Sequence, residues 1–186
     1  LIMKQKSGKL VVLVTALILM CSASSAEVVE LRPAVVEKDG VIGIEYRSGE
    51  SLVGRSAEAA PAGVELVLPG AAGVPVHFRT KTLRDGTIEL GPATTGELRF
   101  RLRITQKNPS LVERTLEVTA KAAQQFAITF PFESAVDGEL ASYTGTEKDR
   151  IVYHAGVRER SNQAFPVAML RTSDRVFGIV TDSPGL

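Results

Sequence analysis

The side chains best suited to binding chemistry gather in one short stretch, Tyr153–Asn162. It follows an apolar segment, contains a glycine, and carries His154, Arg158 and Arg160, all of which can donate hydrogen bonds to a polar ligand. Loops of this kind hold binding residues more often than buried segments do. We therefore take His154, Arg158 and Arg160 as candidate substrate-binding residues. The alternative is a solvated connection whose charged side chains pair with one another.

The carboxylates near this stretch do not form a recognisable catalytic pair. Cleavage of a glycoside requires two carboxylates held several ångströms apart across a cleft. Asp149, Glu159 and Asp182 have suitable side chains, but their positions in the sequence give no reason to pair any two of them. We expect no catalytic residue in this chain.

The sequence also lacks the patterns that hold metals and nucleotides. His77 and His154 are the only histidines, and neither has the neighbouring acids of a metal site. No glycine-rich phosphate loop is present. We therefore expect no cofactor. His77 lies in an alternating run, Val76–Arg79, where we expect it to face solvent from a strand.

A row of arginines is the second feature with possible chemistry. The segment Glu97–Ile104 alternates apolar and charged residues, as a strand with one buried face does. The outer face would carry Arg99, Arg101 and Arg103. It is either a basic stripe for an anionic sugar or, as we expect, a solvated surface.

The following strand supports the solvated surface. If the chain folds back around Asn108, Arg103 lies opposite Glu113, and Arg99 lies opposite Glu117. Opposite charges across an antiparallel pair are favourable. The same register places Arg114 on the apolar face, which we expect only near an edge of the sheet.

The elements that position these residues are short apolar segments separated by turn residues, a pattern typical of an all-β sandwich. Tryptophan is absent and aromatic residues make up 5% of the chain, so Val, Ile and Leu must build the core, and they favour strands. The sequence predicts strands at Val28–Leu31, Val41–Tyr46, Val64–Leu68, Val76–Thr80, Thr87–Leu90, Glu97–Thr105, Leu111–Thr119, Ala127–Phe132, Ile151–His154, Pro166–Arg171 and Val176–Thr181. Long loops are expected in Ala57–Gly73, and a short helix only in Val118–Gln125. The predicted fold is an antiparallel β-sandwich.

The first 26 residues have the three parts of a secretory signal. Lys4, Lys6 and Lys9 precede an apolar run, Leu10–Met20, and small residues follow as far as Ala26. The run of about 11 residues is shorter than the roughly 20 that a spanning helix needs. We expect cleavage after Ala26 and export of residues 27–186, without a membrane span, to the periplasm or the cell exterior.

Cleavage would also change the chemistry of the chain. Cys21 is the only cysteine and lies inside the signal, so the mature domain would have no thiol. Acylation of Cys21 in a lipoprotein is a minor alternative, because Met20 stands where such signals have a small residue. The mature chain would keep 19 basic against 21 acidic residues, a net charge of −2. It lacks the basic surplus of a nucleic-acid-binding protein.

The C-terminal segment 164–185 carries a resemblance to a known family. An apolar strand opened by Phe165-Pro166 is followed by a turn, by a strand reading Phe177-Gly178-Ile179-Val180, and by Ser183-Pro184. This outline resembles the late part of the N-terminal β-sandwich, or supersandwich, of secreted glycoside hydrolases in the α-glucosidase and α-galactosidase clan. An aromatic residue often found before the glycine pair in that clan is not reproduced here, since Arg175-Val176 stands near that place.

The resemblance implies a non-catalytic domain that helps shape the substrate pocket of a C-terminal catalytic (β/α)₈ barrel, which supplies the carboxylates. Carbohydrate is then the implied substrate, and the barrel, which a chain of 186 residues cannot also contain, is the implied partner. The sandwich of residues 27–186 is expected to be truncated at its C-terminal end. The alternatives are a self-contained secreted or periplasmic β-domain with a binding or structural role, and a complete small enzyme.

Overall fold

The structure is a computed structural model that describes residues 2–3, 10–22, 30–122, 124–143, 148–153, 167–171 and 175–182. Within these ranges the chain forms strands and no helix. Neighbouring strands pair antiparallel in all three sheets that the described residues form. The predicted all-β class and antiparallel sandwich are therefore confirmed.

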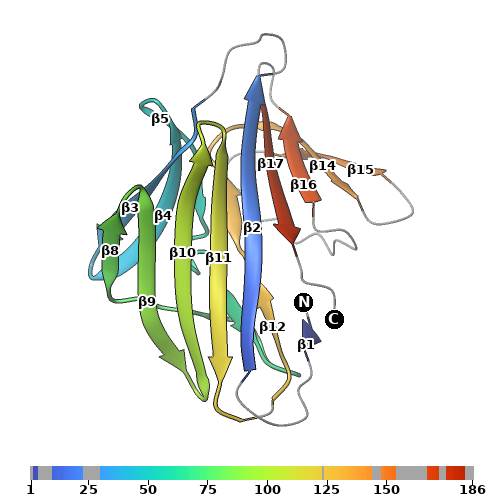
Figure 1. Ribbon diagram of the computed structural model, residues 1–186. Helices are drawn as coiled ribbons and strands as arrows, with labels where there is room; N and C mark the ends of the chain where they lie inside the picture. The colour runs from blue at the N-terminus through green and yellow to red at the C-terminus, as the bar shows by residue number, and fades with distance from the viewer. Residues whose placement is uncertain are drawn as a thin grey trace.

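The largest sheet has nine strands in the order β15-β14-β16-β17-β2-β11-β10-β9-β8. Figure 1 shows β9, β10, β11 and β2 as long neighbouring strands that run the height of the molecule. The bounds of the strands are β2 Leu10–Ser22, β8 Lys81–Arg84, β9 Thr87–Thr95, β10 Leu98–Asn108, β11 Leu111–Ala120, β14 Gly138–Tyr143, β15 Lys148–Tyr153, β16 Val167–Arg171 and β17 Arg175–Asp182.

Two smaller sheets complete the fold. One has the order β13-β5-β4-β3 and the other β1-β12-β6-β7. The bounds of the first are β3 Arg32–Lys38, β4 Val41–Ser48, β5 Ser51–Ser56 and β13 Phe132–Ser134. Those of the second are β1 Ile2–Met3, β6 Glu65–Val67, β7 Val74–Pro75 and β12 Phe126–Thr129.

Two hairpins follow from Asp-Gly pairs in the sequence. Lys38 pairs with Val41, which leaves Asp39 and Gly40 as the two turn residues, with φ values of 54° and 74°. The β8–β9 hairpin repeats this arrangement, with φ values of 49° and 72° at its own Asp-Gly pair. Positive φ at both central residues matches the right-handed twist of the flanking strands, and Asp-Gly tolerates it best.

The β10–β11 hairpin has the predicted faces but not the predicted register. Arg101 lies opposite Glu117, whereas Arg103 lies opposite Thr115, so each pairing is two residues away from the expected one. The turn is centred on Pro109 and Ser110 rather than on Asn108, whose side chain accepts a 2.9 Å hydrogen bond from the Ser110 amide. A shift of two residues leaves every side chain on its predicted face.

Several predicted elements differ from the structure. Glu30 and Leu31, the described end of the predicted strand Val28–Leu31, precede β3 instead of forming a strand. The stretch Val76–Thr80 forms no strand, although Val76 and Phe78 are buried and His77 is exposed. The predicted helix at Val118–Gln125 is also wrong in its described part, because its first three residues end β11. Strands β1, β3, β5, β7, β8 and β14 were not expected.

The segment predicted as the core of the secretory signal forms β2. It lies between β11 and β17 and is antiparallel to both (Figure 1). Ile18 is 1% exposed and belongs to the main core. Removal of this segment on export remains a prediction, and it would take a central strand out of the sheet.

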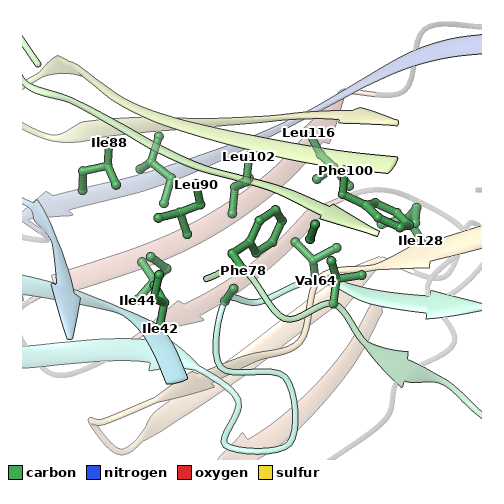
Figure 2. Close-up of a cluster of buried hydrophobic side chains, with 14 of the residues drawn as sticks. Ile42, Ile44, Val64, Phe78, Ile88, Leu90, Phe100, Leu102, Leu116 and Ile128 are labelled. Carbon is green, nitrogen blue, oxygen red and sulfur yellow. The ribbon is translucent and has the colours of Figure 1, made fainter. Parts of the chain in front are cut away.

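The core fills the space between the large sheet and the smaller ones. Figure 2 shows Ile42 and Ile44 of β4 on one side and Ile88 and Leu90 of β9 on the other, with Phe78 beside them in the direction of Val64. Phe78 thus occupies the centre of the core although it belongs to no strand. Its burial explains why the run around it alternates in the sequence.

Candidate functional site

The predicted binding residues His154, Arg158 and Arg160 lie outside the described residues, as does Glu159. Their role stays a prediction. Asp149 lies in β15 and Asp182 in β17, and strands β14 and β16 separate them in the sheet. The sheet therefore does not place these two carboxylates on adjacent strands.

The arginine row lies on the exposed face of β10, as expected for a solvated surface. Arg99, Arg101 and Arg103 are exposed. The ionic partner of Arg103 comes from β9 rather than from β11, since its Nη2 lies 2.9 Å from Oε1 of Glu89. Both side chains are more than half exposed, so the pair contributes little to stability.

The main cluster of buried polar groups surrounds Arg114. This residue is 2% exposed and pairs with Ile104 on β10 and with Ala16 on β2, in the middle of the sheet. The expectation that Arg114 lies near an edge is therefore wrong. Its inward direction follows from the alternation of β11, in which the residues on either side along the same face, Val112 and Leu116, are also buried.

The guanidinium of Arg114 is held by backbone carbonyls and an aromatic ring. Nη2 donates hydrogen bonds of 2.8 Å to the Ala62 carbonyl oxygen and 3.1 Å to that of Gly63. The Phe130 ring lies below the guanidinium, 5.5 Å from Cζ to the ring centroid, which is within the range of a cation–π contact. Among the described residues no carboxylate forms a salt bridge with Arg114. Carbonyl dipoles and the ring thus replace a counter-ion.

Two polar atoms beside this guanidinium, the Tyr46 hydroxyl and Ser56 Oγ, and the guanidinium's own Nε are buried and have no hydrogen-bond partner within the described structure. Burial raises the pKa of Tyr46, and the positive charge of Arg114 lowers the pKa by a smaller amount. The Tyr46 ring is fully buried and lies 5.7 Å from the Phe132 ring. The hydroxyl is therefore held neutral in the core.

The carbonyls that bind Arg114 belong to the segment Ala57–Val64 between β5 and β6, here called the β5–β6 loop. Gly63 has a φ of +66°, and a Cβ there would lie 2.6 Å from Ser56 Oγ and 2.7 Å from Arg114 Nη2. These short distances show that the space beside Gly63 is filled. The side chains around Arg114 therefore leave no room for a ligand beside Gly63. Their hydrogen bonds hold the β5–β6 loop in place instead.

The other end of the β5–β6 loop is held by a second buried charge. Glu133 on β13 is 9% exposed, and its Oε2 accepts a 3.2 Å hydrogen bond from Arg55 Nε. Its Oε1 accepts a 3.4 Å hydrogen bond from the Glu58 amide. Between these anchors, the Pro61 carbonyl accepts a 3.1 Å hydrogen bond from the Ile44 amide of β4. The loop is thus anchored to β4, β11 and β13.

The described residues contain no group of three or more metal-ligating side chains. They also contain no helix long and apolar enough to cross a membrane. Sequence reasoning missed the anchoring role of Arg114, although its signal was present. An arginine at an apolar position of a regularly alternating strand requires buried partners.

No protein-family model matches the chain, and neither curated proteins nor solved structures give a significant match.

Proposed function

We propose that this chain acts as the non-catalytic N-terminal β-sandwich domain of an exported carbohydrate-active enzyme, where it helps shape the substrate pocket of a separate catalytic domain. The observation that carries the proposal is the hairpin of β16 and β17. Met169 lies opposite Gly178 and Val167 lies opposite Val180 in this pair. The resemblance of residues 164–185 to glycoside hydrolase sandwiches implies two successive strands of this kind.

The anchored β5–β6 loop supports the proposal in a second way. A domain that lines a neighbouring pocket must present loops of fixed shape, because misplacing a contact by a small distance weakens binding and catalysis. Arg114 and Glu133 hold the two ends of this loop from different strands. The sandwich therefore has the rigidity that such a role requires.

The most direct test of the proposal is the gene itself. Sequencing downstream of the Leu186 codon should reveal an in-frame continuation of roughly 250 codons or more, the length of a (β/α)₈ barrel. A stop codon directly after Leu186 would contradict the proposal and would favour a self-contained exported β-domain.

Activity and binding measurements separate the roles of the two parts. Purified residues 27–186 should not hydrolyse a panel of aryl glycosides. Turnover that disappears on changing Asp149, Glu159 or Asp182 to Ala would overturn the non-catalytic assignment. In the complete enzyme, Arg158→Ala should raise the KM for the saccharide substrate, whereas Arg101→Ala, at an exposed arginine of β10, should leave it unchanged.

A further inference from the structure

Strand β2 occupies the middle of the nine-stranded sheet, although its residues Leu10–Ser22 lie within the predicted signal. It pairs with all ten residues of β11, Leu111–Ala120, and with all eight residues of β17, Arg175–Asp182. Figure 1 shows it in blue between the yellow β11 and the red β17. Ile18 packs in the core, opposite Val112. Cleavage after Ala26 would therefore leave two open strand edges and uncover the core beside Val112.

An open gap of this kind is unfavourable in the exported protein. Backbone N–H and C=O groups buried away from water require partners, and exposed strand edges pair readily with other chains. The gap also defines what can fill it. The replacement must be an extended segment of about eight to ten residues, antiparallel to both β11 and β17, with an apolar side chain at the position of Ile18.

The order of the strands indicates where such a segment comes from. Strand β16 pairs with β17, and the chain leaves β17 at the end where Asp182 lies opposite Thr15. A strand joined to β17 by a tight turn must run antiparallel to it, which is the direction of β2. Ser183-Pro184-Gly185 follows in the sequence, and proline and glycine are turn-forming residues.

We propose that in the exported protein the position of β2, between β11 and β17, is taken by the segment of the parent chain that follows Leu186. This inference rests on the proposed function, because it requires the chain to continue. The domain is then completed by its own enzyme, and the signal segment occupies the gap only before cleavage.

A second copy of the chain fits the gap less well. An inserted strand must pair along both of its edges. In a second mature copy, β11 already pairs with β10 and β17 already pairs with β16, so each offers one free edge. Two copies can lie edge to edge, but neither of these strands can enter the gap of the other.

Amide hydrogen exchange tests this inference on three proteins: the uncleaved chain 1–186, the mature chain 27–186, and the mature chain extended by the 30 or so residues that the gene encodes after Leu186. Exchange is followed along β11, with β4 as the internal control because it pairs with β3 and β5 instead of β2. We expect β11 to exchange on the order of 100-fold faster in 27–186 than in 1–186, and the extension to restore the slow exchange. Proline in the middle of the added strand should abolish the restoration, because proline cannot donate to a neighbouring strand.

Four outcomes would overturn the inference. Equally slow exchange of β11 in monomeric 27–186 would show that no replacement strand is needed. Protection of β11 in 27–186 that rises with protein concentration would assign the gap to a second copy. An extended protein that stays unfolded, or whose β11 still exchanges fast, would exclude the downstream segment while leaving the proposed function intact. A stop codon after Leu186 would end both proposals together.

Discussion

Nη2 of Arg114 donates a 3.1 Å hydrogen bond to the carbonyl oxygen of Gly63, 51 residues away in the sequence. This bond joins the centre of β11 to the end of the β5–β6 loop. The same nitrogen also binds the Ala62 carbonyl at 2.8 Å. A single side chain on the large sheet thus helps to fix the path of a loop whose buried apolar side chains are those of Ala57, Ala60, Ala62 and Val64.

Changing Arg114 to Ala should strongly destabilise the domain. The substitution leaves a cavity and two carbonyl groups without their donor, and each buried unsatisfied group costs about 1–3 kcal/mol. We expect a loss of about 3 kcal/mol or more in urea unfolding, together with faster proteolysis within the β5–β6 loop. Arg101→Ala, at an exposed position of β10, is the matched control and should cost less than about 1 kcal/mol. Equal losses for the two variants would contradict the anchoring role.

Gly63 and Gly96 provide a matched pair for the tightness of this cluster. Both have positive φ, +66° and +58°, so Ala is strained at either position by about 1–2 kcal/mol. A Cβ at Gly96 meets nothing within 4 Å, whereas at Gly63 it meets Ser56 and Arg114 below 3 Å. We expect Gly63→Ala to lower the free energy of unfolding clearly more than Gly96→Ala does. If denaturant melts give the same loss of unfolding free energy for both variants, the space between Gly63, Ser56 and Arg114 is not tightly filled.

Tyr46→Phe should change the pH dependence of stability more than stability itself. Because burial raises the folded pKa of Tyr46 above 10.0, the stability linked to its protonated form is fully present below about pH 10 and is lost as the pH rises toward the folded pKa. Phe does not titrate, so the variant should lose less stability between about pH 8 and pH 11. Near neutrality the change should cost less than about 1 kcal/mol, since the hydroxyl has no partner in the described structure. Parallel curves of unfolding free energy against pH for the two proteins would contradict a titration of Tyr46 that affects stability.

Phe100 and Arg103 test the two faces of β10. Phe100 is fully buried, and Phe100→Ala should cost about 3–5 kcal/mol because it leaves a cavity. Arg103→Ala removes only an exposed ion pair with Glu89 and should cost less than about 1 kcal/mol. The reverse order in denaturant melts would mean that the faces of this strand are inverted.

A hydrophobic pattern specifies which face of a strand is buried but not the register of the strand with its neighbour. Alternation predicted the buried face of β10 correctly because side chains alternate with a period of two, but the register with β11 depends on where the turn forms. The turn forms at Pro109 and Ser110, and the register also shifts between Gln106 and Asn108. The same alternation marked Arg114 as anomalous, yet its carbonyl partners lie about 50 residues away and only the folded chain brings them together.

Other elements were beyond prediction for different reasons. Lys81-Thr82-Leu83-Arg84 forms β8 with all four residues exposed, so no hydrophobic pattern marks it. Phe78 is buried as the pattern indicates but pairs with no strand. The apolar run Leu10–Ser22 suits both a signal and a buried strand, because the two share one composition.

We predict that the chain is exported and loses the segment that forms β2. The most direct test of this prediction is the intact mass and N-terminal sequence of the protein recovered outside the cytoplasm of a bacterial host. We expect a chain that begins at Glu27, without Leu10–Ser22. Recovery of a chain that still contains Leu10–Ser22, held in the membrane fraction, would contradict this prediction.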